Sequence, residues 1–85
     1  MHDSRMALMD ALKVAKASAR GLPTQVQEQV RQIAEVQDEN ERHRLAAEVS
    51  RWIFSQHGVP GIDKFTLIAY NALRDALEPY MIGDI

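Results

Sequence analysis

The 85-residue sequence contains no cysteine and only three histidines. Disulfide bonds and cysteine-ligated zinc are therefore excluded. His2, His43 and His57 are widely separated, and none has another histidine three or four residues away. We therefore expect no metal ion and no cofactor. A domain this small is only marginally stable by itself. Without disulfide bonds or a metal ion, its fold must be stabilised by close helix packing or by self-association.

The sequence also lacks an excess of charge of either sign. Ten Lys and Arg residues are balanced by twelve Asp and Glu residues, which gives a net charge of −2. Proteins that bind nucleic acids usually have a strongly basic face, so this composition disfavours that class. Apolar residues make up 46% of the chain. This fraction is typical of a folded globular domain and is too high for a disordered chain.

No apolar run approaches the roughly 20 residues of a membrane-spanning helix. Near the N-terminus, Asp10 and Lys13 interrupt the apolar residues, so we predict no signal peptide. These absences predict a cytoplasmic protein with no membrane partner.

Recognisable catalytic motifs are missing as well. Ser18, Ser50 and Ser55 fall within predicted helices, without the glycines of a nucleophile elbow. The GVPG stretch at 58–61 has no Lys-Ser/Thr pair, so it is not a phosphate-binding loop. It is better explained as a helix end, a turn and a new helix capped by Asp63. We predict that the chain has no catalytic residue and is not an enzyme.

What the sequence does contain is helical periodicity. It predicts an all-α fold in one domain spanning residues 1–85. Helices are expected at roughly 4–20, 23–37, 39–57 and 63–78, with Gly21 and Gly58 following two of them. Pro79 is expected to end the fourth helix.

The stretch QDENERHR, residues 37–44, contains no apolar residue. One interpretation is a break, with Asp38 capping a new helix. The other is a continuous helix from about 24 to 57, which would strongly imply a dimer. The apolar stripe of the second helix would continue onto Gln37, Asn40 and Arg44, all polar. We therefore favour a break at 37–40.

The helical spacing also predicts which faces are buried. In the third helix, Trp52 is the expected anchor of the core, because it would bury the largest apolar area. In the first helix, the expected inner half contains Ala7, Leu8, Ala11, Leu12, Val14 and Ala15. In the fourth helix, we expect Tyr70 and Leu77 at the flanks of a buried face made of Phe65, Ile68, Ala69, Ala72, Leu73 and Ala76.

Several large apolar residues are left outside these faces, and the C-terminal tail is unusually apolar. The tail either folds back over the core or docks on a partner. These residues predict a small intracellular interaction module, such as a regulator, adaptor or inhibitor, that binds another protein or itself, as a homodimer, through an apolar helix face. The candidate protein-binding residues are Met6, Met9, Phe54, Tyr80, Met81 and Ile82.

The alternative is a small dimeric DNA-binding regulator. Arg42, Arg44 and Arg51 are its candidate contacts. However, Glu41 and Glu48 lie within helical reach of Arg44 and would partly neutralise this basic row. Nucleic acid therefore remains the disfavoured partner.

Overall fold

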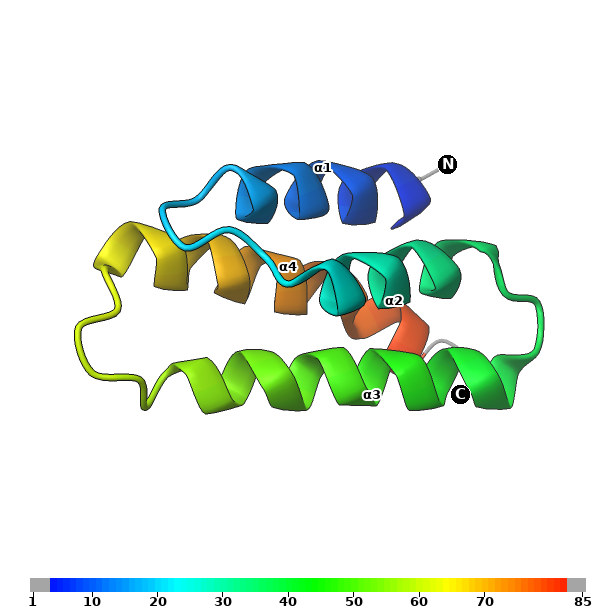
Figure 1. Cartoon of the computed structure of the whole chain (residues 1–85). Coiled ribbons are helices and arrows are strands. Elements are labelled where there is room, and N and C mark those ends of the chain that lie inside the picture. The colour runs from blue at the N-terminus through cyan, green and yellow to red at the C-terminus, as the bar shows by residue number, and fades with distance from the viewer. Residues whose placement is uncertain (1–3, 83–85) are drawn as a thin grey trace.

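The computed structural model describes residues 4–82, and within that range it contains four α-helices and no strand. These are α1 (Ser4–Lys16), α2 (Thr24–Glu35), α3 (Glu39–Gln56) and α4 (Lys64–Ile82). Consecutive helices run in opposite directions and pack against each other, and α4 also packs against α1 (Figure 1). The predicted all-α, four-helix fold is confirmed as an antiparallel bundle.

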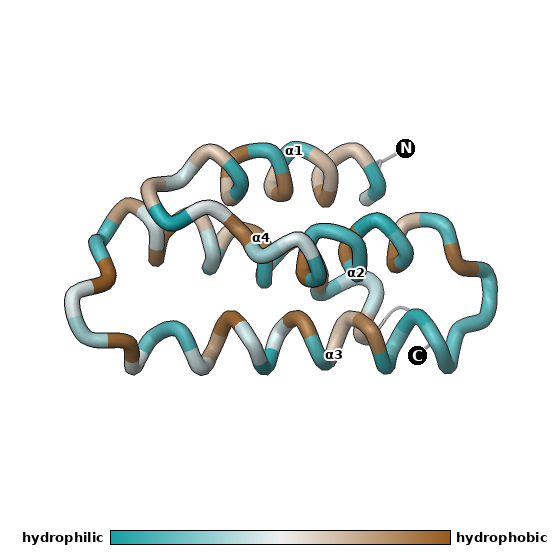
Figure 2. The backbone as a smooth tube through the Cα atoms, viewed as in Figure 1, coloured by the Kyte–Doolittle hydropathy of each residue, from teal (hydrophilic) through white to brown (hydrophobic). Residues whose placement is uncertain are grey.

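The predicted break between the second and third helices is also confirmed. α2 ends at Glu35, and Val36 is extended, with φ −69° and ψ 140°. The Asp38 side chain caps α3 by accepting a hydrogen bond from the Asn40 backbone N–H at 3.1 Å. Figure 2 shows that the turn and the start of α3 are hydrophilic.

Two predicted helix ends are wrong. α1 ends at Lys16 instead of residue 20, and the chain then passes through turns to Gly21, which has a φ of 63°. Ser18 contributes to this end, because its hydroxyl donates to the Ala15 carbonyl at 2.7 Å and competes with the helical backbone bonds. α4 continues through Pro79 to Ile82 instead of ending at 78. Tyr80 and Met81 pack against the core there, and this burial offsets the missing N–H of proline.

The core is aliphatic, with one aromatic residue at its centre. Tyr70 is only 2% exposed, and its hydroxyl donates to the Gly21 carbonyl at 2.7 Å. Its ring lies 5.2 Å from that of Trp52, which is partly buried against the same core. Tyr70 thus ties α4 both to α3 and to the turn after α1. The other buried residues around it are Leu8, Leu12, Ala15, Leu22, Val26, Val30, Ile33, Leu45, Ala46, Val49, Ile53, Leu73 and Leu77.

The buried face predicted for α4 is only partly right, because the helix is rotated about its axis toward Tyr70 and Leu77. Ala69 and Leu73 are buried as predicted, whereas Phe65 is 80% exposed and Ile68 is 56% exposed. Ala72 is also exposed. The apolar arc of this helix is wider than one core-facing stripe, and the contacts of Tyr70 select its other side for burial. On α1, Val14 is likewise 55% exposed and lies outside the core.

The first turn of α4 is held by Asp63, as predicted. Its carboxylate accepts from the Thr66 backbone N–H at 2.9 Å and from the Thr66 hydroxyl at 2.6 Å. Thr66 is fully buried, so this bond satisfies a hydroxyl that has left water. The two hydrogen bonds from Thr66, the one from its hydroxyl first, lower the pKa of Asp63 below its ordinary value.

Replacement of Tyr70 by Phe tests the role of its hydroxyl. We expect Tyr70→Phe to lower the free energy of unfolding by about 1 kcal/mol, the usual net value of a hydrogen bond, because the Gly21 carbonyl loses its partner. This corresponds to a fall in Tm of about 5 °C for a domain of this size. Tyr70→Leu should cost more, since it also removes the ring contact with Trp52. An unchanged Tm for Tyr70→Phe would contradict this role.

The cap at Asp63 predicts a pH dependence. A lowered folded-state pKa means that the carboxylate stabilises the fold fully above the ordinary pKa of 3.8, and that this is lost as the pH falls through the folded pKa. The difference in Tm between wild type and Asp63→Ala should therefore be constant above the ordinary pKa of 3.8 and shrink as the pH falls below it. Asp63→Asn is the control, because it retains an acceptor without a titrating group. A difference that stays constant at the lowest pH would show that the carboxylate charge does not matter.

Candidate functional site

An open apolar groove between α1 and α4 is the most distinctive surface feature of the bundle. It has a volume of about 450 Å³. The end of α1 lies beside the start of α4, where the groove is formed (Figure 1). We call it the α1–α4 groove, and its lining consists of Val14, Ala17, Ser18, Phe65, Ile68, Ala69 and Ala72.

The lining of the groove contains both small and large side chains. Ala17, Ala69 and Ala72 leave room between the two helices, whereas Phe65 and Ile68 stand out from α4. The only hydroxyl in the lining belongs to Ser18 and already donates to the Ala15 backbone carbonyl. The groove is therefore an apolar surface with raised and hollow parts and almost no hydrogen-bonding capacity of its own.

Charged residues lie at both ends of the groove, with opposite sign. Asp10 precedes Val14 by one turn on α1, and Asp75 follows Ala72 by one turn on α4. Because α1 and α4 are antiparallel (Figure 1), these two exposed acids lie at the same end. Lys64 lies one turn before Ile68, at the other end. None of these three charged residues forms an ion pair within residues 4–82.

Arg20 adds a second positive charge to the end that holds Lys64. Its guanidinium is close enough to Asp63 to help lower the pKa of that carboxyl. Asp63 also lies at this end, where its ionised carboxylate accepts the hydrogen bonds of Thr66 and offsets one of the two positive charges. The apolar lining thus lies between a basic end, with Arg20 and Lys64 exposed, and an acidic end with Asp10 and Asp75, of which Asp75 also borders the hollow between α3 and α4.

The six protein-binding residues predicted from the sequence do not form one surface. Phe54 is 67% exposed on α3, where its ring contacts His57. Met9, Tyr80 and Met81 are partly buried against the core. The side chain of Ile82 lies outside the described residues. The assignment of these residues to a protein contact remains a prediction.

Met6 is the predicted contact residue closest to the groove in helical register. It is 62% exposed and precedes Val14 by two turns on the row that also contains Asp10. The row therefore extends the apolar surface beyond the acidic end of the groove. The sequence identified this outer end of the surface but assigned its centre to the core.

The arginines of the alternative DNA-binding hypothesis are largely engaged with the protein itself. Arg44 contacts Glu41 at 2.6 Å and Glu48 at 2.8 Å, and the bond to Glu41 is the main cause of its raised pKa. Arg42 donates to the Val36 carbonyl at 3.3 Å and lies 3.8 Å from Glu39. Arg51 is exposed. This part of α3 alternates in charge instead of forming a basic face.

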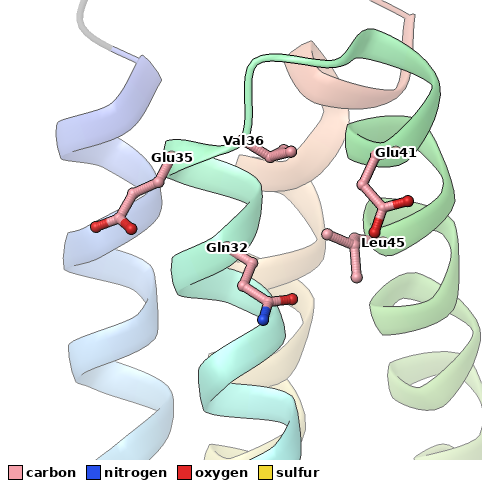
Figure 3. Close-up of a pocket in the computed structure, with 5 residues that line it drawn as sticks. All are labelled: Gln32, Glu35, Val36, Glu41 and Leu45. Carbon is pink, nitrogen blue, oxygen red and sulfur yellow. The ribbon is translucent and has the colours of Figure 1, made fainter.

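A second hollow lies where α2 turns into α3, and it is lined by Gln32, Glu35, Val36, Glu41 and Leu45. Figure 3 shows that the Glu41 side chain lies beside Leu45, whereas the Glu35 carboxylate points away from it. Glu41 is already bound to Arg44. Within residues 4–82, no three His, Asp or Glu residues lie together as they would around a metal ion.

A third hollow, between α3 and α4, mixes the charges of Arg74, Asp75 and Glu78 with Ser50 and Met81. It has no apolar surface comparable with the α1–α4 groove. Among the described helices, none is both long and apolar enough to span a bilayer.

Phe65, Ile68 and Val14 are the surface residues that sequence reasoning missed. Their spacing on α4 and α1 is that of a buried stripe, so periodicity alone assigns them to the core. One signal was available, because Phe65, Ile68 and Ala72 follow Lys64 and precede Asp75 on the same side of the helix. An apolar stripe bounded by charges in this way is also typical of a protein contact surface, which has an apolar centre and a polar rim.

Comparison of the chain with protein-family models, with curated proteins and with solved structures finds no match.

Proposed function

We propose that this chain is a small, non-catalytic, cytoplasmic interaction module, and that it binds protein through the α1–α4 groove. The observation that carries the proposal is the 80% exposure of Phe65 beside an exposed Ile68 and Val14. Contiguous apolar patches on a small soluble domain commonly mark sites of interaction. Aromatic residues at the centre of such a patch supply much of the binding energy.

The chemistry of the groove favours a protein partner over a small ligand. Sites for small molecules usually enclose most of the ligand and place a few polar groups that orient it. This groove is open, and its one hydroxyl is already bonded to Ala15. Apolar side chains that project from a helix need no such polar groups, because they dock by shape and burial.

The position of the groove also supports this function. Apart from the buried Ala69, the residues that form it are outside the core, which is completed by Tyr70, Leu73 and Leu77 on α4. The bundle can therefore present Phe65 and Ile68 without depending on a partner to fold. A partner would bury this surface and gain roughly 2 kcal/mol for each large apolar side chain taken out of water.

A matched pair of aromatic substitutions tests the proposal. Phe65→Asp and Phe54→Asp each place a charge at an exposed phenylalanine, 80% and 67% exposed respectively. Because neither ring is in the core, both variants should unfold within about 0.5 kcal/mol of wild type. We expect proteins captured by immobilised wild type, identified by mass spectrometry, to be lost with Phe65→Asp and retained with Phe54→Asp.

The two variants also separate the groove from the contact residues predicted on the sequence. Loss of capture with Phe54→Asp alone would assign the contact to α3 and overturn the groove as the binding site. Capture that survives both substitutions would do the same. Thermal unfolding of each variant shows whether a loss of capture is simply a loss of fold.

A further inference from the structure

The groove has an apolar centre between ends of opposite charge, and this arrangement is complementary to itself. We propose that its occupant is a second copy of this chain, related to the first by a two-fold axis perpendicular to the groove, so that the two α4 helices cross antiparallel. The proposal rests on the proposed function and names the partner. It also specifies the relative orientation of the two copies.

The charges select this orientation. A two-fold interface repeats every contact, because residue i of one copy meets residue j of the other and the reverse. Lys64 and Asp75 are exposed on the outer side of α4, on either side of Ile68 and Ala72. They lie about 16 Å apart at 1.5 Å per residue. Antiparallel crossing therefore places Lys64 of each copy near Asp75 of the other.

The opposite arrangement is penalised by the same residues. If the α4 helices crossed in parallel, Lys64 would face Lys64 and Asp75 would face Asp75. Exposed like charges repel, and interfaces use such repulsion to reject wrong arrangements. The charges on the turn and on α1 agree, because Arg20 lies at the basic end with Lys64 and Asp10 at the acidic end with Asp75. Antiparallel crossing brings Arg20 toward Asp10 of the second copy.

The shape of the groove is also self-complementary. Phe65 and Ile68 are the raised parts of the lining, and the alanines between the helices are its hollow part. With the axis midway between Lys64 and Asp75, Ile68 of one copy reaches the region of Ala72 in the other. Each copy therefore supplies both a projecting side chain and a hollow that receives one, as in the packing of helices by ridges and grooves.

The limited extent of the surface favours a reversible dimer over a permanent one. A stable interface of standard size buries about 800 Å² per partner. The face used here is bounded by α1, which has 13 residues and is about 20 Å long, and by the first half of α4. This surface is at or below the standard size. We expect a reversible dimer with a Kd of about 10–100 µM.

The test is sedimentation equilibrium of the full chain with two charge-reversal variants, Lys64→Glu and Asp75→Lys. Each variant alone brings like charges together twice in the antiparallel dimer, so we expect each to dimerise about tenfold more weakly than wild type.

An equimolar mixture of the two variants is the matched control. In a mixed dimer, the introduced glutamate of one chain meets the introduced lysine of the other at one contact. At the symmetry-related contact, the unchanged Lys64 meets the unchanged Asp75. Both contacts then join opposite charges, so the mixture should associate about as strongly as wild type at low salt, and raising the salt should reduce the differences.

Three results would overturn the proposal. A wild-type chain that stays monomeric up to about 1 mM, well above the expected Kd, would exclude a second copy. If capture by the groove still depended on Phe65, the proposed function would stand with a different protein as partner.

A dimer that persists in Phe65→Asp would place the interface elsewhere. The third result concerns the orientation. If Phe65→Asp abolishes the dimer, but mixing Lys64→Glu with Asp75→Lys does not restore the association that each charge variant has lost, the antiparallel orientation is wrong.

Discussion

Tyr70 fixes how α4 is turned about its own axis, and the rest of the structure follows from that choice. Its hydroxyl bonds to the Gly21 carbonyl at 2.7 Å, and its ring lies 5.2 Å from that of Trp52. Because the two contacts lie on different neighbours, they leave little freedom for the helix to rotate. Leu73 and Leu77 then complete the core, and Phe65 and Ile68 are left on the outside. The proposed binding surface is thus a consequence of how the core is closed.

The sequence was sufficient for the architecture, because four helical patterns separated by Gly21, the polar stretch at 37–44 and the turn at 58–61 admit few arrangements. It was not sufficient for the rotation of α4. The apolar residues of that helix cover more than one face. The contacts that decide its rotation join Tyr70 to Gly21, 49 positions earlier in the chain, and to Trp52 on α3. The end of α4 was predicted wrongly at Pro79 for a similar reason, because the packing of Tyr80 and Met81 against the core is a tertiary effect that the local sequence does not show. The candidate site was missed at its centre because a contact surface and a core stripe share the same helical spacing.

Charge and apolar surface have different roles in the proposed interface. Phe65, Ile68 and Val14 supply the area that a partner removes from water, which gives affinity. Lys64 and Asp75 are exposed at the ends, where a single ion pair contributes little energy, so their effect is on orientation. The arginines of α3 differ, because Arg44 is held by Glu41 and Glu48. The charges that matter for the proposed contact are therefore those around the groove.

The most direct test of the proposed interface is to follow backbone amide NMR shifts of the labelled wild-type chain as its concentration rises. We expect concentration-dependent shifts that cluster around Val14 on α1 and around Phe65, Ile68 and Ala72 on α4, with little change near Phe54 on α3. Such a pattern would identify the α1–α4 groove as the surface where two copies meet. Shifts that cluster around Phe54, or a spectrum that does not change with concentration, would contradict a dimer formed through this groove.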